Sequence, residues 1–425
     1  MANNLESNFR EKIMPAVLEG FDNERVYTKT VNTQLLDGMS SAKAGESVAF
    51  KRETDYVEIS TTDGDLTGED ISPIVVGNSF GRVQNFSTVI VEMDLIERAL
   101  KIGNEAELLK PAMKRLATKF DQNFANFMMK NTGLLAGTPG NAVNGWEDVA
   151  QAGAVMRATG VPMDNDWYYA VNPFTQVALA NQNRGLGAGG AAGGSIKTAL
   201  DKATIDSNFA GMNVITATTQ SLYTSGAGAD RTGALASNPD VTYVTAKDTL
   251  TQSLAVTGMT TALVIKAGEQ VQITGRNRLN LSTRDLVVDA TGAPIVWTGT
   301  VLNDVTLSGG AGTLVVSGPA IYEVGGAFNT VDSAPVAGDV VTVLGADGAT
   351  HQPNLFWHKN AFSIGTIALP KLSAQQNTAT TQDGVRIKST RGSDIITGKD
   401  IVRFDILPAY MVNTPFMSGQ GFGTS

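Results

Sequence analysis

The sequence predicts an α+β chain with a large β domain inserted into it. Residues 104–131 repeat apolar side chains at helical spacing, and strand-like runs at 212–218 and 354–365 flank a different kind of block. That block, Tyr223 to Thr350, is rich in Thr and Val, with Gly recurring at turn spacing. Such β-branched composition with regular turn signals predicts many short strands. We therefore expect a β domain inside a mixed host.

Composition narrows the possible functions. At 425 residues the chain predicts two or three domains. It has no Cys, which excludes disulfides, thiolate catalysis and Cys-ligated metals. A net charge of −9 argues against a nucleic-acid-binding surface in the usual sense, which would be basic. Residues 1–20 are charged and lack a signal-peptide pattern, and no apolar run approaches the ~18 residues of a membrane span. We expect a soluble cytoplasmic protein.

The first part of the chain predicts an arm and a long hairpin. Residues 5–20 indicate a short amphipathic helix ended by Gly20. Residues 46–92 contain two strand-like arms joined by a long polar tip, and loops of that length are usually functional or mobile. The acids at the tip lack the order of a calcium loop. We expect them to pair with basic residues on a neighbouring subunit; they are Asp63, Asp65, Glu69 and Asp70.

Residues 104–131 give the clearest helix. Its apolar stripe has spacings of three and four and predicts a core face; it comprises Leu109, Met113, Leu116, Phe120, Phe124 and Phe127. Pro111 is expected to mark the first turn, with Glu105–Lys110 as a separate turn or a kinked start. From Pro111 onward the helix would span ~31 Å.

Residues 145–222 predict alternating helices and strands. Trp146–Thr159 is predicted to be a helix stopped by Gly160, Trp167–Pro173 a buried strand, and Phe174–Asn183 a helix. A Gly-rich loop follows at 184–194, which composition predicts to be mobile. It formally matches the G-x-G-x-x-G pattern, but a dinucleotide site needs a strand before that motif and here a helix precedes it.

No arrangement of residues predicts catalysis. His351 and His358 are seven residues apart, so one strand would place them on opposite faces, and structural hydrogen bonding is the favoured role. The chain has no G-x-S-x-G, Walker A or H-E-x-x-H motif. We therefore expect a structural protein without enzymatic activity, cofactor or metal.

The inserted block contains a faint internal repeat. Ala267–Gly275 matches Ala337–Gly345, each reading as a tight turn, an alternating strand and a Gly. Two such units favour a small barrel or sandwich.

The order of parts resembles the major capsid (coat) proteins of short-tailed, P-twenty-two-like bacteriophages, over essentially the whole chain. Local segments carry the resemblance as well: Ser47–Arg52, Phe127–Asn131, Asn141–Ala150, Pro353–Trp357, Ile367–Leu372 and Arg403–Tyr410. It implies a Hong Kong ninety-seven-like capsid fold. The implied parts are an N-terminal arm (1–45), an extended loop (46–92), a peripheral domain with a spine helix (93–144), an axial domain (145–222), an inserted β domain (223–350) and returning strands (351–425).

The resemblance also implies roles for particular residues. The Gly-rich loop would lie near the capsomer centre, with Arg184, Gly185, Gly187 and Gly190. The inserted domain would contact other capsomers, and its candidate charges are Arg276, Arg278, Arg284 and Asp285. They are sparse for a family in which this domain can form salt bridges between capsomers.

The implied function is a shell subunit. With a scaffolding protein, copies would assemble as pentamers and hexamers into an icosahedral procapsid in the host cytoplasm. The shell would expand as double-stranded DNA enters through a portal, and the protein would end in the virion, with no membrane partner. An encapsulin-like nanocompartment shell shares the fold but usually lacks a large inserted β domain. A secreted β-rich adhesin is disfavoured, because residues 1–20 lack a signal-peptide pattern. The interpretation as a nucleotide-dependent enzyme depends on the Gly-rich loop alone.

Overall fold

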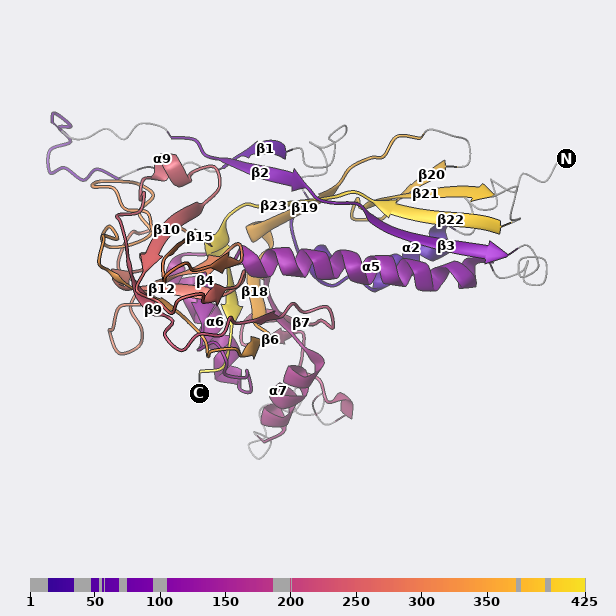
Figure 1. Ribbon diagram of the computed structural model, residues 1–425, viewed down its shortest axis with the longest axis horizontal. Helices are drawn as coiled ribbons and strands as arrows, with labels where there is room; N and C mark the ends of the chain where they lie inside the picture. The colour runs from indigo at the N-terminus through magenta and orange to yellow at the C-terminus, as the bar shows by residue number, and fades with distance from the viewer. Residues whose placement is uncertain are drawn as a thin grey trace. The chain divides into compact units, whose positions relative to one another are not determined.

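The computed structural model describes residues 14–33, 47–52, 56, 58–68, 75–94, 105–185, 199, 201–371, 376–393 and 399–424. The chain forms two compact units, each assembled from segments far apart in the sequence (Figure 1). Unit 1 comprises residues 1–49, 80–125 and 362–411. Unit 2 comprises residues 50–79, 126–361 and 412–425.

The long helix α5 (Glu105–Lys130) forms the core of unit 1 up to residue 125, and α2 (Met14–Asn23) packs on it. The rings of Phe21 and Phe120 lie 6.1 Å apart. The buried Asp121 carboxylate accepts a hydrogen bond from the Thr28 backbone N–H at 3.1 Å. The N-terminal helix continues past Gly20, and the first part of its predicted range lies outside the described residues.

The prediction of a separate turn before Pro111 was wrong. The helix α5 runs through Pro111 without a break over 26 residues. A proline in this position removes the hydrogen bond to the carbonyl of residue 107. Because residue 107 and Pro111 are both exposed, water reaches the helix at this point. The apolar stripe on the opposite face keeps the helix in place, since Leu109, Met113 and Leu116 are all buried.

Two four-stranded sheets complete this part of the fold. One has the antiparallel order β20 (Gln376–Thr380), β21 (Arg386–Ser393), β22 (Lys399–Ile406) and β3 (Ser87–Asp94). The other has the order β1 (Ser47–Lys51), β2 (Asn78–Val83), β23 (Pro408–Val412) and β19 (Phe362–Thr366). In the first sheet, side chains alternate between a buried and a solvent face. Ile387, Val402 and Phe404 are buried, whereas Lys388 and Arg403 lie on the other face.

A six-stranded mixed sheet carries the core of unit 2. Its order is β4 (Leu134–Ala136), β24 (Ser418–Gly421), β18 (Asn354–His358), β5 (Trp167–Val171), β7 (Met212–Thr216) and β6 (Asn208–Phe209). The helices α6 (Trp146–Thr159) and α7 (Pro173–Gly185) accompany it. The predicted bounds of α6 are confirmed, whereas β5 ends at Val171, two residues before the predicted end, because Pro173 already begins α7. Gly160 ends α6 with a left-handed φ of 90°, which glycine adopts readily.

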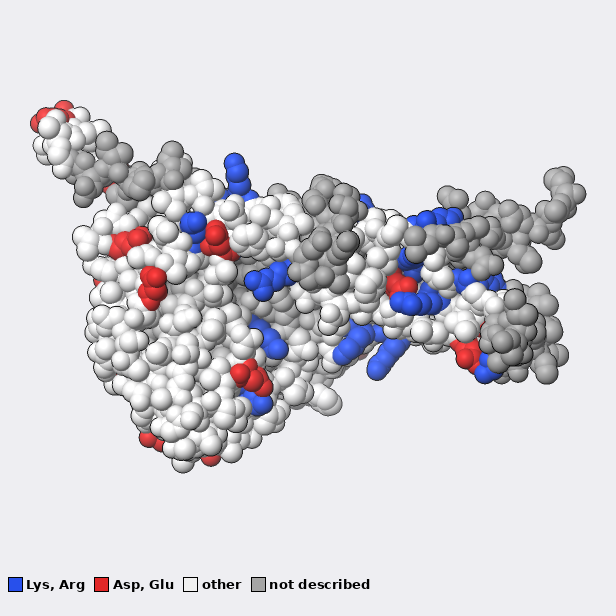
Figure 2. All heavy atoms as spheres, turned by 45° about the horizontal axis from the view of Figure 1, so that its top comes forward, with Lys and Arg blue, Asp and Glu red and all other residues white. Residues whose placement is uncertain are grey.

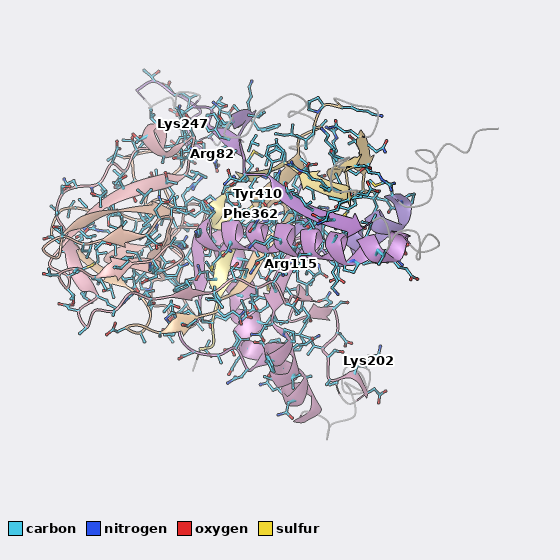
Figure 3. All side chains as sticks on the ribbon, turned by 45° about the vertical axis from the view of Figure 1, so that its right-hand side comes forward. Arg82, Arg115, Lys202, Lys247, Phe362 and Tyr410 are labelled. Atoms are coloured by element: carbon cyan, nitrogen blue, oxygen red, sulfur yellow. The ribbon has the colours of Figure 1, made fainter. Side chains whose placement is uncertain are left out.

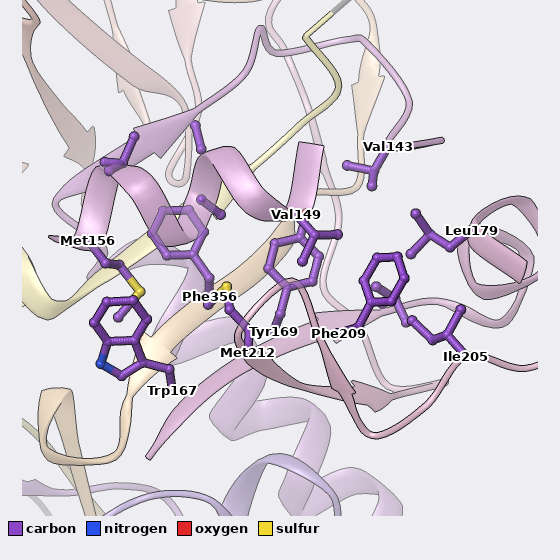
Figure 4. Packing of buried hydrophobic residues seen from close by; sticks show 14 of the residues in the cluster. Val143, Val149, Met156, Trp167, Tyr169, Leu179, Ile205, Phe209, Met212 and Phe356 are labelled. Carbon is purple, nitrogen blue, oxygen red and sulfur yellow. The ribbon is translucent and has the colours of Figure 1, made fainter. Parts of the chain in front are cut away.

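The packing between α6 and this sheet is apolar (Figure 4). Val149 and Met156 from the helix belong to one buried cluster with Tyr169, Met212 and Phe356 from the strands. Phe209, Ile205 and Leu179 extend the same cluster toward α7. The apolar side chains of these helices and strands therefore pack into one core.

The inserted block forms a closed six-stranded barrel, which confirms the predicted β insertion. The order is β10 (Thr251–Thr257), β15 (Gly312–Ser317), β13 (Val296–Val301), β12 (Gln270–Asn277), β16 (Val340–Val343) and β9 (Thr232–Leu235). Its interior is apolar and includes the fully buried Trp297. The short strands β8 (Tyr223–Thr224) and β17 (Thr350–His351) pair with each other where the chain enters and leaves the block.

The internal repeat is confirmed as a structural repeat. Gly268 and Gly338 open their turns with φ of 102° and 93°. The strands that follow, β12 and β16, are antiparallel neighbours. An acid follows each Gly and accepts a backbone hydrogen bond from three residues earlier: Lys266 N–H to Glu269 at 2.9 Å, and Val336 N–H to Asp339 at 2.8 Å.

The two repeat acids bind arginines in different surroundings. Asp339 forms a double hydrogen bond with Arg276 near the surface, at 2.7 Å for both contacts. Glu269 is fully buried and pairs with Arg231. Burial raises the pKa of the Glu269 carboxyl, although Arg231 opposes that shift. The barrel therefore contains a buried ion pair. If its partners separated, each charge would be buried without a counter-ion or water.

Removing one partner of this pair is expected to destabilise the barrel strongly. Arg231→Met should lower the free energy of unfolding by about 3–5 kcal/mol, because the Glu269 charge would stay buried and unpaired. Arg231→Met combined with Glu269→Leu should recover most of that loss. Denaturant titration followed by tryptophan fluorescence measures both. A double variant no more stable than the single one would contradict this account.

Candidate assembly surfaces

The base of the extended loop is held by Arg52. Its backbone N–H donates to Gly77 O at 2.7 Å, which joins the two ends of the loop. Its side chain donates to Asn78 O at 3.3 Å and Val412 O at 3.4 Å, and also to Asn413 O. Burial lowers the pKa of the guanidinium to about 10. One cation thus satisfies several carbonyl groups at the base of the loop.

Gly77 lies against the inserted block. A Cβ added at Gly77 would stand 2.6 Å from Lys247 O and 2.8 Å from the Tyr243 hydroxyl, closer than real contacts allow. Tyr243 is in the short helix α9 (Tyr243–Ala246), and its ring stacks on Phe328 at 3.7 Å between centroids. Only glycine permits this close approach between the loop base and α9.

The acidic tip is exposed and locally ordered by its own side chains. Asp63 accepts from the Asp65 N–H at 3.1 Å, and Asp65 accepts from the Thr67 N–H at 2.9 Å and its hydroxyl at 2.6 Å. The Thr67 hydrogen bonds lower the pKa of the Asp65 carboxyl. Asp65 therefore stays ionised at neutral pH. Glu69 and Asp70 lie outside the described residues, and pairing of the tip with another subunit remains a prediction.

The four charges proposed for the inserted block occupy different environments. Arg276 binds Asp339 within the barrel. Arg284, at a left-handed φ of 60°, donates to Asn329 O at 2.9 Å, and Asp285 is exposed. Arg278 is 3% exposed and so cannot reach another subunit from this position. The prediction that Arg278 contacts other capsomers is therefore corrected: its side chain makes contacts inside the subunit.

Arg278 attaches the barrel to the residues that follow α5. Its Nη2 donates to Gly133 O at 2.9 Å and Thr298 O at 3.0 Å. Burial lowers the pKa of Arg278 to about 10, and its hydrogen bonds go to neutral oxygens. Two further contacts join the same parts of the chain. Thr132 and Thr300 share a hydroxyl hydrogen bond of 2.9 Å, and Gln420 donates to Met129 O at 3.1 Å and Gly268 O at 2.9 Å. We call these two contacts and the Arg278 hydrogen bonds the barrel attachment.

The residues proposed for the capsomer centre are only partly described. Arg184 and Gly185 belong to the last turn of α7, two residues beyond the predicted helix end. Gly187 and Gly190 lie outside the described residues. The helix that precedes the G-x-G-x-x-G pattern is confirmed, which leaves the pattern without the strand that a dinucleotide site requires.

The two histidines have structural surroundings. His358 is buried in β18, and its Nε2 lies 3.0 Å from Asp164. His351 is buried in β17 beside Tyr223, with ring centroids 5.2 Å apart. Burial and the nearby Arg231 lower the pKa of His351. In the described ranges, no group of three or more His, Cys, Asp or Glu side chains is placed to hold a metal ion. Nor does any helix there have the length and apolar character to cross a membrane.

Basic side chains gather over β20, β21 and β22 in the view of Figure 2. Many of them are already matched by carboxylates. Arg391 binds Asp400 at 2.7 Å, Arg403 binds Asp405 at 2.7 Å, and Lys399 pairs with Glu92. This face of unit 1 therefore carries less free charge than its number of cations suggests.

Sequence reasoning missed Arg52 and Gly77. Nothing near Arg52 in the sequence indicates that it binds carbonyl groups more than 300 residues later. Gly77 carried no signal beyond its residue type, because the atoms that exclude a side chain there belong to Tyr243 and Lys247. Both roles depend on contacts between distant segments.

Comparison with known proteins identifies the family. Residues 1–423 match the family model described as P22 coat protein, gene protein 5. A curated protein named major capsid protein, from Acyrthosiphon pisum secondary endosymbiont phage 1, is 34% identical over 429 residues and all of both chains. Solved chains of Mycobacterium phage Che8 (TM-score 0.46, covering 94% of this chain and 91% of that one) and of the cyanophage P-SCSP1u capsid (0.44, 94% and 89%) are each 12% identical. By the family model and the curated relative, the chain belongs to the P22 coat protein family.

Proposed function

We propose that this protein is the major capsid protein of a tailed bacteriophage and assembles, with a scaffolding protein, into an icosahedral shell around double-stranded DNA. The observation that carries the proposal is the full-length match to the coat protein family and to a phage major capsid protein. Self-association, a portal complex and residence in the virion follow from the same proposal.

The geometry of the loop base supports a role in assembly. A loop that reaches a neighbouring subunit needs a fixed origin, because motion at the base is amplified at the tip. Arg52 and the close contact at Gly77 supply that origin. The exposed tip carries the acidic side chains of Asp63 and Asp65, which suit a basic surface on the next subunit. Repeated around a shell, many such modest contacts add up through multivalency.

Neither comparison that identifies the family supports the competing functions. The family match covers the inserted barrel as well as its host, so the barrel is part of the family pattern and not an adhesin module. A nanocompartment shell would share the general construction, but the curated relative is a phage major capsid protein.

Removing the charge at the loop tip is expected to impair assembly. Asp63→Asn with Asp65→Asn keeps the side-chain oxygens that hold the turn and deletes two negative charges. We expect at least a several-fold lower yield of closed shells by electron microscopy, with an unchanged melting temperature. Glu147→Gln with Asp201→Gln is the matched control and should assemble normally. Full shell yield from the tip variant would show that the charges are dispensable.

Gly77→Ala tests the loop base. The added methyl would meet Lys247 O at 2.6 Å, so the loop must leave its base in another direction. We expect a folded chain that forms few closed shells when co-expressed with its scaffolding protein. Gly392→Ala is the control, because a Cβ there has nothing within 4 Å. Normal shells from Gly77→Ala would contradict the proposed role of the base. Failure of the unaltered chain to form shells would overturn the capsid function itself.

A further inference from the structure

We propose that the solvent face of α5 between Lys110 and Lys119 binds the phosphate backbone of double-stranded nucleic acid. The proposal deepens the proposed function, since it assigns the packaged DNA a contact surface on the shell subunit. It concerns only unit 1, which holds all the residues involved.

Four cations lie on the exposed half of α5 within ten residues. Lys110, Lys114, Arg115 and Lys119 are all exposed, whereas Leu109, Met113, Leu116 and Phe120 on the opposite face are buried. At 3.6 residues per turn, Lys110 and Lys114 form one row and Arg115 and Lys119 a second row. The rows extend along ~14 Å of helix, a length over which duplex DNA carries about eight phosphate charges. Figure 3 shows Arg115 on this helix.

These cations are poorly neutralised by their own chain. Lys114 forms an ion pair with Glu24 at 2.8 Å, and Lys119 donates to the neutral Gln122 at 3.2 Å. Among the described residues, Lys110 and Arg115 have no ion pair. The next acid along the helix, Asp121, is buried and binds the backbone at Thr28. The sheet that contains β21 and β22 differs, because Arg391 and Arg403 there are matched by Asp400 and Asp405.

The composition of the face favours a phosphate backbone over a protein partner. Protein interfaces usually contain a buried apolar or aromatic centre. On α5 the one large apolar side chain exposed within the described residues is Leu108, which precedes the four cations. The residues between the two rows, Thr118 and Gln122, are short or polar. Sequence-independent phosphate binding needs cations alone, and its strength falls steeply with salt.

The first experiment titrates a fluorescent 20-base-pair duplex with the purified full-length chain from 50 to 200 mM salt. Four phosphate contacts predict that affinity falls on the order of 100-fold across this range. Arg115→Gln with Lys119→Gln should reduce that fall to roughly ten-fold. Lys202→Gln with Lys371→Gln makes the same change in net charge at exposed positions elsewhere and should behave like the unaltered chain.

A second experiment uses the absence of cysteine in the natural sequence. A photoreactive label on Gln122→Cys should crosslink to the duplex, and the same label on Lys202→Cys should not. No binding by the unaltered chain, or equal effects of the two Gln pairs, would overturn the proposal. If the Arg115 and Lys119 variant binds the duplex normally but forms no shells, the face belongs to an acidic protein segment and the proposal fails. Shell formation without duplex binding would overturn this proposal and leave the capsid function standing.

Discussion

The buried guanidinium of Arg278 sets the constraint on which the arrangement of unit 2 depends. A guanidinium stays charged even at the lowered pKa, so burying it requires acceptors for its N–H groups. It donates to carbonyl and hydroxyl oxygens, and one of these acceptors, Gly133 O, lies just past the end of α5. If the barrel moved away from Gly133, the charge would lose an acceptor in a site that water cannot easily reach. The barrel and the end of α5 are therefore expected to move as one body.

The rest of the attachment follows the same principle. The Thr132–Thr300 and Gln420 contacts are buried hydrogen bonds, and hydrogen bonds have stricter geometry than apolar contacts. Apolar packing stabilises the barrel and the sheet beneath α6, each of which has a large buried hydrophobic cluster. The polar contacts instead specify one alignment between them. A shell subunit that must occupy several symmetry environments benefits from keeping such an element rigid and confining variation to its arms.

Sequence reasoning succeeded where local rules decide the structure. The bounds of α6 followed from apolar periodicity and from Gly160, and the repeat at Gly268 and Gly338 followed from turn chemistry. It failed at Pro111, where the buried stripe outweighs the local preference of proline. It also assigned Arg278 to the surface, because an isolated arginine in a β-rich block gives no sign of burial. The acceptor at Gly133 is 145 residues away in sequence, and only the folded chain brings them together.

The most direct test is hydrogen–deuterium exchange of Arg278→Met, with Arg276→Met as the control that alters a barrel arginine paired on the surface. Loss of the attachment predicts faster exchange both in the barrel strand β13 and in residues 129–134, at the end of α5 and just past it. The Arg276 variant should change exchange only within the barrel. Unchanged exchange at residues 129–134 in the Arg278 variant would contradict the claim that this side chain joins the barrel to its host.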